Sequence, residues 1–422
     1  MLAVAIGAAL AGCGSSGTVQ GGNDTYSATT LTVYSDLPLL GPDGAQMASI
    51  VDGEMLALYN RGGHVGKFHV SLESLNDYPD ASVSDPLLPD PLRSARNQIG
   101  ESAYTASSDL STAAYIGDYD SAATAISLPL NNQNDILQIS PGSPYVGFTD
   151  ANAADLAGDP RAFDPYGTPT FARLVPSDAV EARAAVSWMR SLGVRRLALL
   201  SDDSNAPENF NGVIAKEVAS DAAAAGITVV GDQPGIDTSS LSSPGDYARV
   251  ASAVAAEHPD AILLGGSADA GAAALWQALH AAAPGAKLFA PSTLATPAFL
   301  RALGAAASAT YVTSPILEPS QYPAAAQAVF AQYRRVFTAA PSVYVLYGYD
   351  AMNDILAAIA KAGRNAPSRP HLRSAFFALG HSGFKGTLGD YTIDAAGDTS
   401  LQRIDGYRVG AGGALVLARE IS

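Results

Sequence analysis

The chain has 422 residues, with 24 Lys and Arg against 40 Asp and Glu, which gives a formal net charge of −16. This length allows two or three domains with sizeable apolar cores. The charge argues against nucleic acid or an anionic membrane surface as a partner, because both require clustered cations. Beyond the first dozen residues, no uncharged apolar stretch approaches the roughly 20 residues that a membrane-spanning helix needs.

The first predicted element is an apolar run that ends in Leu-Ala-Gly-Cys13, and Cys13 is the only cysteine. Small residues before a cysteine resemble the lipobox of bacterial lipoproteins, although no Lys or Arg precedes the run as such signals usually have. We expect a signal peptide over residues 1–12 and lipidation of Cys13, and a buried, inert cysteine is the alternative. Residues 13–29 are rich in Gly, Ser and Thr, which predicts a flexible tether.

From residue 31 onward, short β-rich runs alternate with longer Ala-rich amphipathic stretches, the pattern of βα units around a largely parallel sheet. A helix over 178–192 illustrates the pattern, because its Val180, Ala184 and Trp188 form an apolar stripe. Strands are expected at 31–35, 68–72, 114–117, 136–140, 197–201, 227–230, 261–265 and 287–290, and near Tyr391, Tyr407 and Leu415. Further helices are expected at 208–225, 245–258, 269–283, 324–337 and 350–362.

Five motifs resemble type I periplasmic binding proteins, most of all the branch that binds branched-chain amino acids. They are Tyr34–Pro42, Val51–Leu58, Tyr115–Ser121, Ile139–Pro141 and Tyr347–Ala351. The resemblance implies an α/β fold of two Rossmann-like lobes with parallel-rich sheets and three inter-lobe crossovers, which closes on a small solute for an ABC importer. We expect lobe 1 to comprise residues 30–173 plus 318–388, and lobe 2 residues 174–317 plus 389–422.

Loops that follow the strands of lobe 1 are expected to face the ligand, because ligands collect at the carboxyl ends of parallel strands. By resemblance, Ser121 supplies a hydroxyl to a ligand carboxylate, and capping of the helix that starts there is the alternative. Ordinary βα-loop packing is the alternative for the residues of the first loop. The other ligand contacts predicted in this lobe are Ser35, Leu37, Gln46, Asp118, Tyr119, Ser140, Gly142 and Ser143.

The sequence departs from the resembled family at positions that would hold an amino acid. Pro144 stands where these proteins usually have Thr, and proline offers neither a hydroxyl nor an N–H. Ser292 stands where they place an acid for the ligand ammonium group, and Ser267 replaces an aromatic residue. A standard leucine-like ligand is therefore less certain than a small polar or amphipathic solute in general.

Residues elsewhere in the sequence could substitute for the missing groups. Asp202, Asp203 or Asp350 could bind an ammonium group, with ordinary solvent exposure as the alternative. Phe210 could supply an aromatic surface. Tyr347 could line the pocket, with core packing as the alternative. The ligand contacts predicted beyond lobe 1's loops are Asp203, Asn205, Ser267, Ser292 and Tyr347.

Motifs for catalysis are missing from the sequence. The six histidines, at positions 64, 69, 258, 280, 371 and 381, have no metal-ligand spacing, and no G-x-S-x-G nucleophile elbow or Gly-Lys phosphate loop occurs. We expect no catalytic residue, no metal and no cofactor.

The expected function is that of a solute-binding lipoprotein of an ABC importer. It would be a monomer, exported and lipid-anchored at the outer face of the cell membrane or in the periplasm. Its partners would be a small-molecule ligand, the permease subunits and the membrane through the lipid anchor alone. The alternative is a surface receptor that uses the same closure to regulate a partner protein.

Overall fold

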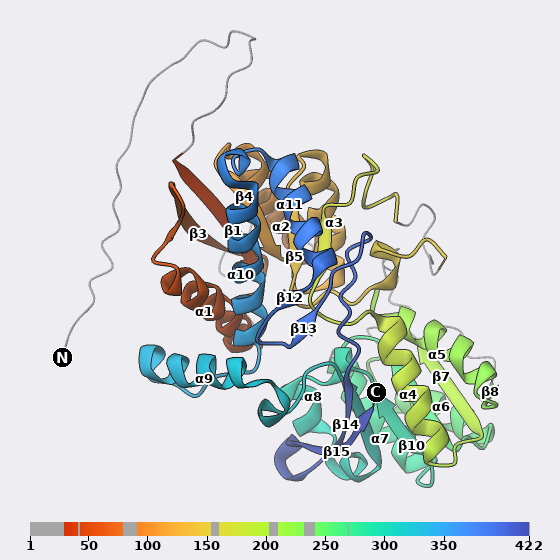
Figure 1. Cartoon of the computed structure of the whole chain (residues 1–422). Helices are drawn as coiled ribbons and strands as arrows, with labels where there is room; N and C mark the ends of the chain where they lie inside the picture. Colours follow the sequence, from red (N-terminus) through yellow and green to blue (C-terminus); the bar gives the residue numbers. More distant parts are fainter. Residues whose placement is uncertain are drawn as a thin grey trace.

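The computed structural model describes residues 29–40, 43–78, 91–152, 160–201, 210–231, 241–268 and 270–421, except for the side chains of 91–96, 211 and 270. The described chain forms two lobes, each built around its own sheet, and Figure 1 shows one lobe above the other. Cys13 and the predicted signal peptide lie outside the described residues.

Lobe 1 is built on a six-stranded sheet in the order β2-β3-β1-β4-β5-β6. The pairings are parallel except for the short antiparallel pair β2 and β3. Its central strand β4 is buried at every position, as expected for a parallel strand covered on both faces. The strands are β1 (Thr30–Leu37), β2 (His64–Val65), β3 (Phe68–Asn76), β4 (Thr112–Gly117), β5 (Leu137–Ser140) and β6 (Phe171–Arg173).

Among the described residues, six helices belong to lobe 1, three from the first part of the chain and three from much later. Residues of the later helices share one apolar core with the sheet, in which Leu346 and Ile355 pack with Val33 and Ile116. The helices are α1 (Gly44–Asn60), α2 (Pro91–Ser108), α3 (Ser121–Gln133), α9 (Ala324–Phe337), α10 (Val345–Ala362) and α11 (Arg369–Ser382). A small hairpin of β12 (Phe384–Lys385) and β13 (Asp390–Tyr391) packs against this core.

Helices α1 and α10 approach each other through two glycines. A Cβ atom on Gly348 would lie 1.9 Å from the carbonyl oxygen of Ile50, and one on Gly53 would lie 2.0 Å from that of Val345. Both distances are far below van der Waals contact, so the two backbones touch directly. This packing holds the middle of α1 against the first turn of α10.

Lobe 2 is built on a seven-stranded sheet in the order β15-β14-β11-β10-β9-β7-β8, in which β14 and β15 run antiparallel to their neighbours. The strands are β7 (Arg196–Ser201), β8 (Thr228–Val230), β9 (Ala261–Gly265), β10 (Lys287–Ala290), β11 (Thr310–Ser314), β14 (Ile404–Val409) and β15 (Leu415–Ile421). Its helices are α4 (Asp178–Ser191), α5 (Val213–Ala224), α6 (Pro244–Ala256), α7 (Ala270–Ala282) and α8 (Pro297–Ala302). Two apolar cores form, one containing Trp276 and the other Trp188, as expected for a sheet covered on both faces.

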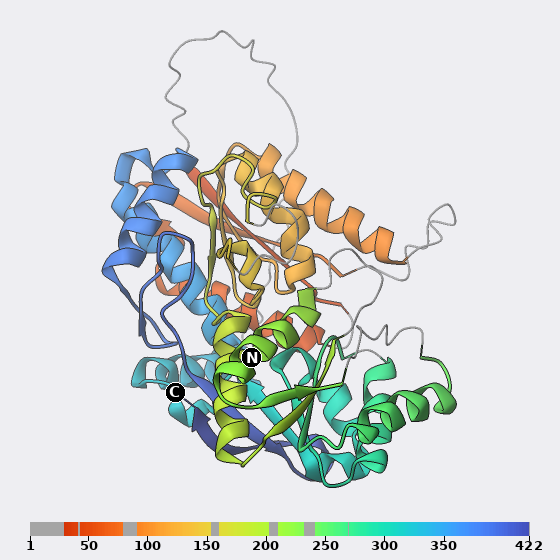
Figure 2. The ribbon, with the colours of Figure 1, turned by 90° about the vertical axis from the view of Figure 1, so that its right-hand side faces the viewer.

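The chain crosses between the lobes three times: after β6, after β11 and after β13. In Figure 2 the upper and lower bodies are distinct, and the blue C-terminal part of the chain runs from one to the other. The first and third crossings are joined, because the buried Arg173 pairs with Asp398 at 2.6 Å. The second and third are joined by a hydrogen bond of 3.5 Å from the Arg403 guanidinium to the Gln321 carbonyl. The three segments therefore lie side by side, as a hinge requires.

The expected α/β fold with two lobes, parallel-rich sheets and three crossovers is confirmed. The exact lobe boundaries stay a prediction, and the packing of Tyr391 and Ile393 in the core of lobe 1 continues beyond residue 388. The sequence analysis did not predict β6, β11, α2 or α11. It placed the start of α10 at Asp350, five residues after the observed start at Val345.

Short 3-10 helices complete the described chain at Val146–Phe148, Phe210–Gly212, Ser292–Leu294, Gly304–Ala309, Pro319–Gln321, Gly363–Asn365 and Ala411–Gly413. No helix among the described residues is long and apolar enough to cross a bilayer.

Candidate functional site

A cavity of about 750 Å³ lies between the two lobes. Its walls come from loops at the carboxyl ends of parallel strands in both sheets, where open α/β sheets collect ligands. Lobe 1 contributes Pro38, Leu40, Asp43, Gln46, Met47, Tyr78, Tyr119, Asp120, Ser121, Gly142, Pro144 and Tyr344. Lobe 2 and the crossing segments contribute Val175, Ser267, Ala268, Ser292, Thr293, Ala295, Thr296, Pro297, Leu300, Ser314 to Pro319, Tyr407, Gly413 and Leu415.

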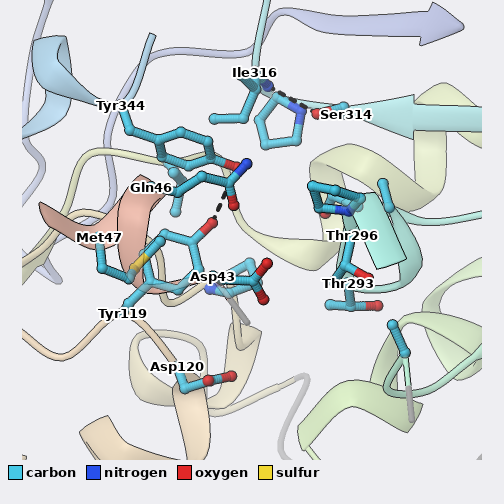
Figure 3. A pocket seen from close by; sticks show the side chains of 18 of the residues that line it. Asp43, Gln46, Met47, Tyr119, Asp120, Thr293, Thr296, Ser314, Ile316 and Tyr344 are labelled. Atoms are coloured by element: carbon cyan, nitrogen blue, oxygen red, sulfur yellow. Dashed lines mark hydrogen bonds between the residues drawn. The ribbon is translucent and has the colours of Figure 1, made fainter. Parts of the chain in front are cut away.

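Much of the lobe 1 wall follows the carboxyl ends of three strands that are neighbours in the sheet, β1, β4 and β5. After β1, the chain turns into α1 and presents Asp43, Gln46 and Met47 from the start of that helix. After β4 and β5, the next loops present the segment Tyr119 to Ser121 and then Gly142. Figure 3 shows the labelled residues of this wall gathered on one side of the cavity, with Thr293 and Thr296 on the opposite side.

Two tyrosines from distant parts of the chain form the aromatic part of this wall. The rings of Tyr119 and Tyr344 are 6.0 Å apart in an edge-to-face arrangement, and their hydroxyl oxygens are 3.4 Å apart. Gly142 makes room for this pair, since a Cβ atom there would lie 2.4 Å from the Tyr119 ring. Burial raises the pKa of Tyr119, and the nearby charges of Asp120 and Asp43 add to the shift, so the phenol stays neutral.

Two carboxylates face the cavity from lobe 1. Asp43 precedes α1 and Asp120 precedes α3, and neither side chain makes a cap hydrogen bond. In Figure 3 both carboxylates point from the lobe 1 wall toward the gap. Desolvation raises the pKa of Asp120 and the charge of Asp43 raises it further, while desolvation raises that of Asp43. Asp120 is nevertheless open to the water of the cavity.

An acid that the sequence analysis missed lies behind the lobe 2 wall. Glu181 of α4, 3% exposed, accepts hydrogen bonds of 2.7 Å from the Ser292 amide and 2.6 Å from its hydroxyl. The Thr313 hydroxyl donates a third bond, of 2.8 Å. Burial raises the pKa of Glu181, and the three hydrogen bonds oppose that shift. The sequence analysis expected no acid at Ser292. The structure places Glu181 of α4 directly behind that serine.

Six of the predicted contacts line the cavity: Gln46, Tyr119, Ser121, Gly142, Ser267 and Ser292. Ser121 is buried at the start of α3, and its hydroxyl oxygen accepts a 3.3 Å bond from the Tyr145 amide. The hydroxyl hydrogen remains free to donate to a ligand. Asp203 and Asn205 lie outside the described residues.

Six other predicted residues are not brought to the cavity: Ser35, Leu37, Asp118, Ser140, Ser143 and Tyr347. Strand β1 continues to Leu37, so Ser35 and Leu37 stay inside the sheet, and the Ser35 hydroxyl donates to buried Glu54 at 3.0 Å. Tyr347 is buried on α10, with its hydroxyl 3.5 Å from the Pro315 carbonyl.

The remaining three of these residues bond one another behind the wall. The Ser140 hydroxyl donates to the Asp118 carbonyl at 2.6 Å, and the Ser143 and Thr124 hydroxyls are 2.6 Å apart. The Asp118 carboxylate accepts from the hydroxyls of Ser127 and Tyr115. These groups shape the loops that carry Tyr119 and Gly142.

Two of the proposed substitutes are also absent from the cavity wall. Asp350 is buried, and it accepts bonds of 2.9 Å and 2.8 Å from the amides of Thr387 and Leu388. Phe210 is buried in an aromatic cluster, with its ring 4.8 Å from that of Tyr145. Among the described residues, no group of three or more His, Cys, Asp or Glu side chains is placed to hold a metal ion.

Several wall residues were not predicted, notably Asp43, Tyr78, Asp120 and Thr293. Asp43 and Asp120 directly precede helices after strand ends, a position that sequence reasoning usually assigns to capping. The strand-end rule that selected Tyr119 and Ser121 would also have selected Asp120.

Two lobes, three adjacent crossings and a cavity at facing strand ends define a two-lobe solute-binding protein of the type I periplasmic binding protein fold. Residues 104–414 match the family model described as periplasmic binding protein, and the chain belongs to this family. No curated protein sequence matches the chain.

Solved structures of similar fold cover nearly the whole chain. A leucine-binding protein LivK from Thermotoga maritima has a TM-score of 0.70 and 18% identity, over 93% of this chain and 98% of that one. A solute-binding protein from R. palustris in complex with benzoate has a TM-score of 0.67 and 19% identity, over 93% and 96%. A substrate-binding protein from Desulfitobacterium hafniense in complex with Leu has a TM-score of 0.69 and 20% identity, over 92% and 100%. The resemblance drawn from the motifs is confirmed.

Proposed function

We propose that the chain is the extracytoplasmic solute-binding lipoprotein of an ABC importer, and that its lobes close on a small polar or amphipathic solute, branched-chain amino acid-like or related. The observation that carries this proposal is the inter-lobe cavity of about 750 Å³ at the facing strand ends. Its size suits a small-molecule ligand. The neighbours named for leucine and benzoate are consistent with solutes of this size.

Hinge closure is supported by the three adjacent crossing segments. Lobe 1 contributes acids, tyrosines and Ser121 to the cavity, whereas lobe 2 contributes hydroxyl groups and apolar side chains. A ligand that contacts both walls favours the closed state by its extra contacts there. The closed form would then be the one that permease subunits recognise.

Lipid anchoring rests on the sequence around Cys13. Mass spectrometry of the protein from its native membrane should show a diacylglyceryl thioether on an N-terminal Cys13. Replacement of Cys13 with Ala should release the protein into the soluble fraction. An unmodified Cys13 in membrane-extracted protein would contradict the anchor while leaving solute binding untouched.

Solute binding can be tested by isothermal titration against amino acids, amines and small carboxylates. At least one solute should bind with measurable heat, and the radius of gyration from X-ray scattering should fall when it does. A protein that binds nothing in such a panel and shows one radius throughout would refute the proposal.

A further inference from the structure

The charged residues that line the cavity are all acidic. They are Asp43 and Asp120 from lobe 1 and Glu318 from a crossing segment. Among the side chains that the structure describes, no Lys, Arg or His belongs to the cavity wall. The segments 41–42, 79–90, 153–159, 202–209, 232–240 and 269 contain no Lys, Arg or His in their sequence. Arg93 and Arg96 of α2 are the two cations whose side chains are not described.

Among the described residues, the two lobe 1 carboxylates have no counter-charge. Neither the Asp43 nor the Asp120 side chain makes a hydrogen bond or ion pair with a described residue. Their charges act together, since Asp43 contributes to the raised pKa of Asp120. Behind them, Asp77 is 5% exposed and its Oδ1 has no hydrogen-bond partner among the described residues. Desolvation raises the pKa of Asp77, with further contributions from the charges of Asp118, Asp36 and Asp120.

The uncharged part of the wall suits a cation with an apolar body. Tyr78, Tyr119 and Tyr344 line the cavity, and the faces of aromatic rings attract ammonium groups. Met47, Leu40 and Ile316 add apolar surface beside them. On the lobe 2 side, Thr293 lines the cavity, and its buried Oγ1 has no hydrogen-bond partner among the described residues. The cavity and the tyrosines are observations independent of the carboxylates.

The same wall disfavours a ligand carboxylate. The helix start at Ser121, which the family resemblance assigns to a ligand carboxylate, is preceded directly by the free carboxylate of Asp120. The neighbouring loop residue is Pro144, which has no amide hydrogen to donate. A negative group at Ser121 would therefore meet a like charge and one donor fewer than an ordinary loop provides.

We propose that the cavity takes an organic cation, a protonated amine or quaternary ammonium compound with an aromatic or apolar body and no carboxylate. This inference rests on the proposed function, because it names the class of solute bound at that site. It assigns Asp43 and Asp120 to the cation and the tyrosines to its body.

Three compounds with one phenyl-alkyl skeleton test the inference by titration at pH 7. Phenethylamine carries the amine alone, L-phenylalanine adds a carboxylate, and 3-phenylpropionate carries the carboxylate alone. We expect phenethylamine to bind at least tenfold more tightly than phenylalanine and 3-phenylpropionate to bind most weakly. Choline tests the quaternary ammonium group in the same way.

Two variants test whether Asp43 and Asp120 bind the cation. Asp43→Asn with Asp120→Asn should weaken phenethylamine binding at least tenfold. Glu101→Gln, which removes one charge from an exposed site on α2 outside the cavity wall, should leave the affinity within twofold. Circular dichroism of each variant verifies that it is folded. Equal losses in the cavity variant and the control would overturn the assignment of the two carboxylates.

The outcomes separate the inference from the proposed function. Binding of phenylalanine or 3-phenylpropionate as tight as that of phenethylamine overturns the inference and leaves solute binding standing. If neither phenethylamine nor choline binds, the inference is wrong. If no compound in the wider panel of amino acids and carboxylates binds either, both proposals are contradicted.

Discussion

Replacement of Gly348 with Ala should separate α1 from α10 and damage the cavity wall. The added Cβ would lie 1.9 Å from the Ile50 carbonyl oxygen, against about 3.5 Å for an ordinary contact. The helices must therefore move apart by about 1.5 Å, because the obstructing atom is backbone and cannot rotate away. Overpacking of this kind costs about 1–3 kcal/mol, and we expect about 2–3 kcal/mol here.

The assay is urea unfolding monitored by circular dichroism, with Gly100→Ala as the matched control. Gly100 lies within α2, where an added Cβ meets nothing within 4 Å, so Ala should stabilise that helix by about 0.5–1 kcal/mol. The Gly→Ala substitution is thus expected to lower the free energy of unfolding at Gly348 and to raise it at Gly100. Equal unfolding midpoints for the two variants would refute the reasoning. Affinity should also fall for Gly348→Ala, because Tyr344 lies one turn before it.

Three further predictions concern the hinge, the ligand and pH. Arg173→Ala removes the buried guanidinium that pairs with Asp398 and leaves the Tyr145 carbonyl without its donor, which should cost about 1–3 kcal/mol in thermal unfolding, so an unchanged melting temperature would contradict its role. Ser121→Ala should weaken the tightest-binding solute by about 1–3 kcal/mol in titration, and an unchanged affinity would remove the hydroxyl from the site. Burial raises the pKa of Asp350 from 3.8 to about 6, so its stabilising contribution is full below pH 4 and is lost as pH rises through 6, about 3 kcal/mol in all. Asp350→Asn should remove that part of the pH dependence, and parallel stability curves for the two proteins would disprove it.

Much of the fold follows from sequence periodicity. The apolar stripe of α4 predicted a buried helix face, and Val180, Ala184 and Trp188 are buried together. Elements with too few residues to show a periodicity were not predicted, and β6 with its three residues is an example. The run before Asp350 contains alternating aromatic and aliphatic residues that fit either a strand or a helix, and only packing against α1 resolves it as the first turn of α10.

The site was predictable only as far as strand ends were placed correctly. Ending β1 at Ser35 put Ser35 and Leu37 in the cleft, but the strand continues to Leu37 and keeps both within the sheet. Where the ends were right, as after β4, the following Tyr119 and Ser121 do line the cavity. Glu181 could not be found in this way, because tertiary packing alone brings α4 behind Ser292.

The choice of solute depends on a balance of charges at the start of α3. A helix N-terminus favours a bound anion by about 0.3–1 kcal/mol at an exposed site. A like charge about 5 Å away opposes it by about 3 kcal/mol at the effective dielectric constant of a protein surface. With Asp120 directly before this helix and Asp43 close enough to influence it, the repulsion exceeds the attraction. The chain shares its fold with leucine- and benzoate-binding proteins. We propose that the acids at the start of its own α3 favour a cation there over an anion.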